Sequence, residues 1–235
     1  MFKKIFLLVF VFQFAACDTL NQIATDFLEE GGLTNAEVAS GLKQALEFGI
    51  TEGAQKLSQQ DGYFKSAYKI LLPDEARKVT DKLQNIPGFS NIENIILEKI
   101  NRGAEDAAKK AAPIFKDAIT SMSFSDAMNI LMGPKDAATS YLNKTTFNKL
   151  YSAFNPVIVQ SLDKFKAREY WSDAVNAYNK LPFVDHVNPD LDDHVTTQAL
   201  AGLFTMIEKK ELDIRTNIGS RTTDLLRKVF AKQDS

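Results

Sequence analysis

The residues best suited to chemistry lie between positions 185 and 194, where both histidines of the chain stand among aspartates. The group consists of Asp185, His186, Asp190, Asp192, Asp193 and His194. Imidazole and carboxylate groups could bind a divalent ion or transfer a proton, and on a helix Asp190 and His194 would share a face. The alternative is structural, because aspartates in a first helical turn cap free amides and favour the positive end of the helix dipole. Asp190, Asp193 and His194 are the candidate polar site, and we predict no metal there.

A second candidate consists of Arg215 and Arg221, which bracket a turn-like stretch at residues 216–220. Two guanidinium groups with neighbouring hydroxyls could grip a carboxylate or a phosphate in a bidentate manner. Arginines in this setting also pair with acids on neighbouring helices and fix a loop. The pattern therefore leaves open an anion-binding site and a structural clamp.

Other catalytic signatures are missing from the sequence. Gly219-Ser220 lacks the surrounding Gly-x-Ser-x-Gly elbow, and there is no phosphate-binding glycine loop, zinc helix or calcium loop. The acid pairs Glu29-Glu30 and Glu208 with Glu211 are typical of solvated helix ends. A glycosidase pair stays open, since its two acids need only meet in space. We predict no cofactor and favour a protein that is not an enzyme.

The only cysteine, Cys17, directly follows an N-terminal segment typical of export. Two lysines precede an apolar run over residues 5–12, and Ala15-Ala16 supplies the small residues before a cleavage point. This is the order of a secretory signal peptide, and the run is too short for a permanent membrane helix. With cysteine at the cleavage point, the segment resembles a bacterial lipoprotein signal.

The lipoprotein resemblance implies cleavage before Cys17 and acylation of its sulfur. Residues 1–16 would be removed, and residues 17–33 would form the lipid anchor and a short N-terminal helix or tether. We therefore expect a bacterial cell-envelope protein, held at the outer or inner membrane by the lipid on Cys17, with its body facing the periplasm. Asp18 favours the inner membrane by the rules of enteric bacteria, although these rules differ between bacterial groups.

The composition is that of an ordinary globular protein, with 45% hydrophobic and 25% charged residues. The net charge of −2 becomes about −4 once the two lysines of residues 1–16 are removed. Such a balance gives no electrostatic reason to expect a nucleic-acid partner. After residue 12 no apolar run approaches the length of a membrane span.

The spacing of apolar residues predicts an all-α fold, a single-domain bundle of short and medium helices over residues 34–232. A tail follows at residues 233–235, and at most a minor extended piece is expected near residues 62–72. Capping boxes predict helix starts at Thr34, Ser90 and Ser123. Pro113 is expected to kink or break a helix, and Asn155-Pro156 to open one after two short helices at 135–143 and 146–154.

Two further patterns concern packing. Gly41, Gly49 and Gly53 lie inside the first predicted helix and suggest that another segment crosses this face closely; the alternative is a break near Gly53. The middle of the chain is rich in aromatic residues: Tyr141, Tyr151, Phe154, Tyr170, Trp171 and Tyr178. Such residues form either the core or a groove for an apolar ligand or peptide.

The second half of the chain resembles the bacterial domain-of-unknown-function family 4197. The shared blocks are Phe124-Ser125-Asp126-Ala127, Gly133, Asp136-Ala137-Ala138-Thr139, Tyr141-Leu142, Thr145-Thr146, Leu191-Asp192-Asp193, Val195-Thr196, Ala199-Leu200, Gly202-Leu203-Phe204, Ile214-Arg215 and Leu225-Leu226. The resemblance covers about residues 34–232. It implies an exported, often lipid-anchored helical protein without an established activity, and it supplies no catalytic residues. His194 stands where the family leads us to expect a tyrosine, which counts against a metal site there.

These observations predict a lipid-anchored envelope protein that binds or scaffolds rather than catalyses. Its partner would be an envelope protein or an apolar ligand. An envelope hydrolase that uses the carboxylates and histidine around residues 190–194 is one alternative. A carrier that holds an apolar molecule between aromatic helices is another.

Overall fold

A computed structural model describes residues 34–164, 166–187 and 191–231. The predicted export signal, Cys17, the tether and the C-terminal tail lie outside these described residues, as does Asp190 of the candidate polar site. The described chain is all-α, as predicted, and contains no strand. Its elements are α2 (Asn35–Leu57), α3 (Asp74–Leu83), α4 (Ile92–Ala108), α5 (Ala111–Thr120), α6 (Phe124–Leu131), α7 (Ala137–Lys164), α8 (Ala167–Tyr178), α9 (Asp192–Thr216), the 3₁₀ turn η1 (Ile218–Ser220) and α10 (Asp224–Phe230).

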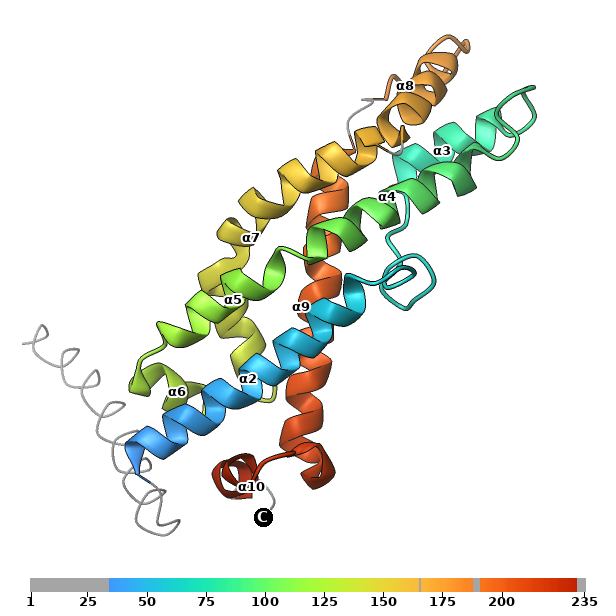
Figure 1. The fold of residues 1–235 in the computed structure, drawn as a ribbon. Coiled ribbons are helices and arrows are strands. Elements are labelled where there is room, and N and C mark those ends of the chain that lie inside the picture. The colour runs from blue at the N-terminus through green and yellow to red at the C-terminus, as the bar shows by residue number, and fades with distance from the viewer. Residues whose placement is uncertain (1–33, 165, 188–190, 232–235) are drawn as a thin grey trace, which may run out of the picture.

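The helices form an elongated bundle (Figure 1). The long helix α7 packs against α4 on one side and α9 on another, and α2 packs against α9, α5 and α6. Helices α3 and α8 lie at one end of the bundle, and α6 and α10 lie at the other, beside the start of α2 (Figure 1). Because α9 runs between the two ends, it brings residues far apart in the sequence into contact.

Side-chain caps define several helix starts. The hydroxyl Oγ1 of Thr34 accepts a hydrogen bond from the amide of Glu37 at 3.2 Å, and Ser123 Oγ accepts from the amide of Asp126 at 3.1 Å. These two predicted capping boxes are therefore confirmed. The prediction at Ser90 is wrong, since α4 begins at Ile92 after Asn91, and no side chain caps it.

Pro113 and Pro156 both lie within helices, but at different positions in the helix. The chain breaks between α4 and α5 at residues 109–110, which places Pro113 in the first turn of α5, where its missing amide costs no helical hydrogen bond. Pro156 does not open a helix as predicted but lies inside α7, which also absorbs the two short helices expected before it. There, packing against α4 and α9 holds the helix together. Helix α7 instead ends at Lys164, and α8 begins at Ala167 after Lys166, which has a φ of 56°.

The glycine face of α2 does allow close crossing. A Cβ atom added to Gly53 would lie 3.0 Å from Met206 Cγ of α9, and one added to Gly41 would lie 2.6 Å from Val229 Cγ2 of α10. Helix α2 continues past Gly53 to Leu57, so the alternative of a break there is wrong. These glycines bring α9 and α10 directly onto the backbone of α2.

Most of the aromatic residues in the middle of the chain belong to the core. Phe154, Trp171 and Tyr178 are buried in one continuous apolar cluster, and Tyr141 and Tyr151 pack against it. Tyr170 is the most exposed of the six. Among the described helices, none combines the length and apolar character required to cross a membrane.

Candidate functional site

The N-terminal end of α9 carries the described part of the predicted polar site. Asp192 and Asp193 lie in the first helical turn, as expected. The carboxylate of Asp193 accepts a hydrogen bond of 2.6 Å from the hydroxyl of Tyr151 on α7. His194 Nε2 bonds to the backbone carbonyl of Leu71, 2.9 Å away, in the segment before α3. The side chains of Asp193 and His194 thus reach different neighbours rather than one common point.

This end of α9 is therefore a structural joint. Asp192 lies 3.8 Å from a guanidinium nitrogen of Arg168 on α8, which adds a third neighbour to the same turn. Within the described ranges, no group of three or more histidine, cysteine, aspartate or glutamate side chains is arranged to hold a metal. Asp185 and His186 are exposed in the loop after α8.

The C-terminal end of α9 contains a buried ion pair that joins three helices. Glu211 and Arg215 are each only 5% exposed, and Arg215 Nη2 lies 2.8 Å from Glu211 Oε1. Glu211 accepts hydrogen bonds from the amides of Ala138 and Thr139, at 2.9 and 2.8 Å, in the first turn of α7. Arg215 Nη2 donates to the carbonyl of Ile130 at 2.7 Å, at the C-terminal end of α6. The pair satisfies free amides of one helix and free carbonyls of another.

Arg221 forms a second clamp beside this pair. Its guanidinium is buried, donates to the carbonyls of Ile214 and Arg215 at 3.0 Å each, and lies over the ring of Phe230. Both predicted anion-binding arginines therefore bond to protein acceptors, which favours the structural alternative. Glu211 is not the solvated helix end that we expected, although its i,i+4 spacing to Arg215 was a signal for the pair.

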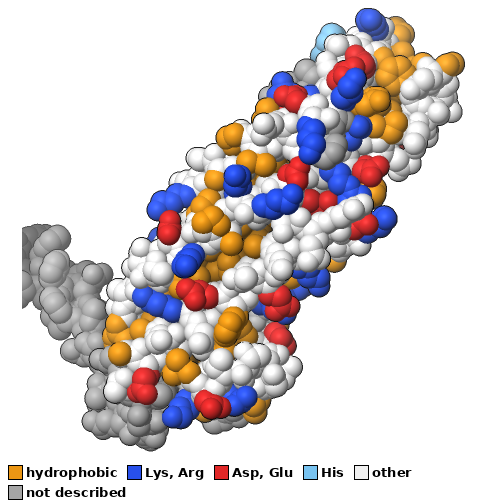
Figure 2. All heavy atoms as spheres, in the orientation of Figure 1, with side chains coloured by type: hydrophobic (Ala, Val, Ile, Leu, Met, Phe, Trp, Pro, Cys, Tyr) orange, Lys and Arg blue, Asp and Glu red, His pale blue; other side chains and the backbone are white. Residues whose placement is uncertain are grey.

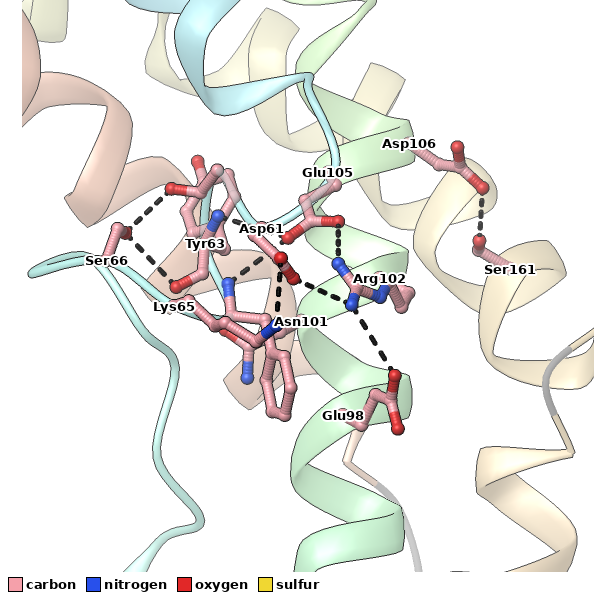
Figure 3. Close-up of polar contacts among 12 residues, drawn as sticks. Asp61, Tyr63, Lys65, Ser66, Glu98, Asn101, Arg102, Glu105, Asp106 and Ser161 are labelled. Carbon is pink, nitrogen blue, oxygen red and sulfur yellow. Dashed lines mark hydrogen bonds and ion pairs between the residues drawn. The ribbon is translucent and has the colours of Figure 1, made fainter.

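A further buried carboxylate, which no sequence motif indicated, fixes the segment between α2 and α3 (Figure 3). Glu105 Oε1 accepts from the amides of Tyr63 and Phe64 at 3.2 and 3.1 Å, and Glu105 Oε2 lies 2.9 Å from Arg102 Nη1. Arg102 Nη2 donates in turn to Asp61 at 2.8 Å. This turn segment has no backbone ladder, so side chains of α4 satisfy its amides instead.

Asn101 and Tyr63 complete this contact. Asn101 Oδ1 accepts from the amide of Ile70 at 2.8 Å, and its Nδ2 donates to the carbonyl of the same residue at 2.9 Å. The hydroxyl of Tyr63 donates to the carbonyl of Ala199 on α9 at 2.7 Å, and burial raises the pKa of this phenol. Hydrogen bonds from Arg102 and then Lys65 lower the pKa of Asp61. The charged groups of this cluster thus serve to hold the fold.

An open groove lies between α2, the end of α9 and the segment that leads into α10. Its volume is about 400 Å³, which is within the range of small-molecule sites. The lining residues are Phe48, Gly49, Thr51, Glu52, Gln55, Lys210, Asp213, Ile214, Ser220, Thr222 and Leu226. A nearby apolar space between α2, α9 and α10 holds only about 20 Å³, enough for one water molecule.

Local contacts shape the groove. A Cβ atom added to Gly49 would lie 3.4 Å from the Cβ of Lys210, so α2 and α9 approach closely at two residues that line the groove. The hydroxyl of Thr223 caps α10 through the amide of Leu226 and donates to Gln44 of α2 at 2.7 Å. Asn217 Oδ1 accepts from the amide of Gly219 at 3.0 Å and shapes the turn that carries Ser220.

The polar side chains of the groove differ from those at both ends of α9. Glu52 and Lys210 form an ion pair at 2.6 Å. Within the described part of the chain, the side chains of Thr51, Gln55, Ser220 and Thr222 make no hydrogen bond, so their donors and acceptors are available to a ligand. No sequence pattern indicated this groove, because its two walls come from distant parts of the chain.

The surface charge can be followed on one face of the molecule. On the face shown in Figure 2, basic and acidic side chains are interspersed, with hydrophobic side chains between them. The described residues form no large field of one sign on this face of the kind that attracts a polyanion.

The comparison with protein families identifies the chain. The family described as "Protein of unknown function (DUF4197)" matches residues 32–231. The chain belongs to the DUF4197 family. No curated protein and no solved structure matches it. The DUF4197 match includes every described helix, so both walls of the groove are within the family's shared region.

Proposed function

We propose that this DUF4197 protein is a lipid-anchored cell-envelope module that binds a ligand in the groove between α2, α9 and α10. The observation that carries the proposal is the contrast among polar groups. The charged residues at both ends of α9 bond to the protein itself, whereas four polar side chains of the groove have no protein partner in the described chain. A ligand-sized hollow with available polar groups is the usual form of a binding site.

The envelope location rests on the N-terminal segment that ends at Cys17. Acyl chains on that sulfur would hold the protein at the outer or inner membrane, with the body in the periplasm, because two or more chains give stable attachment. Helix α2 begins at the end of the bundle that also holds α10, which borders the groove (Figure 1).

The two alternative functions receive less support from the geometry. A hydrolase based on residues 190–194 needs Asp193 and His194 to face one reacting atom, but they bond to different segments. A carrier of apolar molecules needs an enclosed cavity of several hundred Å³, and the apolar space between α2, α9 and α10 is far smaller.

Filling the groove tests the binding proposal. Gln55 is exposed on α2, so Gln55→Trp should block the groove while the fold is kept; Lys78→Trp, at an exposed position of α3 at the other end, is the matched control. Each full-length anchored chain would be captured from its own membranes, and the retained molecules identified by mass spectrometry. We expect a retained species that is lost only with Gln55→Trp. Equal retention by both variants would contradict the proposal.

The anchor has a separate test. Cys17→Ser should abolish lipid attachment, detected by mass spectrometry of the N-terminal peptide, and should leave a folded body by circular dichroism, since Cys17 can form no internal disulfide. An unfolded variant, or unchanged lipid attachment, would show that the anchor is misidentified.

A further inference from the structure

We infer that the ligand of the groove is a neutral saccharide. This inference rests on the proposed function, because it names the class of molecule that the same groove would bind. Three properties of the lining support it: the type of hydrogen-bonding groups, the net charge and one aromatic side chain.

The hydrogen-bonding groups suit a polyhydroxylated ligand. The hydroxyls of Thr51, Ser220 and Thr222 can each donate and accept, and the amide of Gln55 does both with separate atoms. Sugar hydroxyls also donate and accept, so they can pair with every one of these groups. A purely apolar ligand would leave these groups desolvated and without partners, which costs free energy.

The charges of the groove disfavour an anion. Its lining contains the carboxylates of Glu52 and Asp213 and a single cation, Lys210, which Glu52 already pairs at 2.6 Å. A phosphate or carboxylate ligand would therefore meet a net negative surface. A neutral ligand avoids this repulsion, and its hydroxyls can donate to the carboxylates in charge-assisted hydrogen bonds.

Phe48 supplies the apolar part of the site. Phe48 lines the groove and is 48% exposed, and among the described aromatic residues only Phe183 is more exposed. The negative face of an aromatic ring attracts the weakly positive C–H groups of a sugar ring. Leu226 and Ile214 are the other large apolar residues of the lining. The lining thus combines apolar and polar side chains, which matches the two-sided character of a pyranose.

The experiment uses the full chain in detergent on an array of neutral oligosaccharides built from hexoses and N-acetylhexosamines. The sugar that binds best is then titrated by saturation-transfer NMR. We expect Phe48→Ala to weaken binding by about tenfold. Phe183→Ala removes a fully exposed aromatic side chain in the loop after α8 and should leave the affinity unchanged. Circular dichroism confirms that both variants are folded.

Salt provides a second readout. The affinity of a neutral sugar should change less than about twofold between roughly 50 and 500 mM sodium chloride, because no ionic contact with the ligand is screened. A strong decrease would overturn the assignment of a neutral ligand, and so would equal effects of Phe48→Ala and Phe183→Ala.

An array without any binding also overturns the saccharide inference. If Gln55→Trp still removes a molecule captured from membranes, the proposed binding function stands and only the ligand class is wrong. If Gln55→Trp removes nothing, the proposed function itself fails.

Discussion

The two ends of α9 use charged side chains in different ways. At the N-terminal end, Asp193 and His194 each make one contact to a neighbouring segment and remain at least partly exposed. At the C-terminal end, Glu211, Arg215 and Arg221 are buried and bond to several backbone groups of α6, α7 and α9. The sequence marks both ends as possible sites of chemistry, but the buried end is the one in which the charges are needed for folding.

The physical reason is the convergence of helix ends. Helix α6 ends and α7 begins within a few residues, so free carbonyls and free amides arrive together against α9. A carboxylate satisfies the amides and a guanidinium satisfies the carbonyls, in agreement with the helix dipoles. The ion pair of Glu211 and Arg215 therefore takes the place of two ordinary caps.

The largest expected effect comes from Glu211→Ala. It leaves Arg215 buried without its carboxylate and the amides of Ala138 and Thr139 without an acceptor, so the free energy of unfolding should fall by about 3–5 kcal/mol. Urea denaturation followed by circular dichroism measures this change. Asp193→Ala, at the other end of α9, is the matched control and should cost only about 0.5–1.5 kcal/mol, because it removes one hydrogen bond at an exposed site. Equal losses would remove the distinction between the ends.

Arg221→Ala should produce the next largest loss, about 2–4 kcal/mol, because the carbonyls of Ile214 and Arg215 each lose a charged donor in a buried site. Arg168→Ala provides the comparison at the N-terminal end. Its side chain is 48% exposed and its ion pairs are on the surface, so about 0–1 kcal/mol is expected. A smaller loss for Arg221 than for Arg168 in thermal or urea unfolding would contradict the clamp.

Tyr151→Phe tests the joint at the N-terminal end directly. It removes the hydroxyl that donates to Asp193 and keeps the ring, so the free energy of unfolding should fall by about 0.5–1.5 kcal/mol. In a double-mutant cycle with Asp193→Ala, which removes the acceptor, the two losses should not add. Full additivity would mean that this hydrogen bond contributes nothing.

The smallest effect on the free energy of unfolding is expected from a substitution of Asp61. This residue is partly exposed and lies outside α9, so it serves as a reference for both ends of that helix. Hydrogen bonds from Arg102 and Lys65 lower its pKa in the folded chain. Its contribution to stability is therefore complete above the unfolded pKa and is lost as the pH falls through the folded pKa. Asp61→Asn should flatten this part of the pH dependence of unfolding and lower the stability at neutral pH only slightly. If the variant loses stability at acidic pH as steeply as the unmodified chain does, this role of Asp61 is contradicted.

Local signals predicted local structure well. The spacing of Thr34 with Glu37 and of Ser123 with Asp126 correctly indicated two helix starts, because a cap depends on residues three positions apart. The glycines of α2 also correctly indicated a close crossing. The prediction that a helix begins at Asn155-Pro156 was wrong, since tertiary packing of α7 overrides the local preference against proline inside a helix.

Features that depend on tertiary contact could not be predicted in this way. Glu105 has no neighbour in sequence that reveals its bonds to residues 63 and 64, and Glu211 reaches across to residues 138 and 139. The groove is the clearest case, because Phe48 and Thr222 come from opposite ends of the chain. The packing of α9 and α10 on α2 brings them together.

Site-specific photo-crosslinking in living cells tests the central claim most directly. A photoreactive amino acid would replace Gln55 in the groove or, in a second strain, exposed Asp193 at the N-terminal end of α9. We predict a defined adduct from position 55 and none from position 193. An adduct from position 193 alone would place the binding site at the polar cluster and contradict the groove.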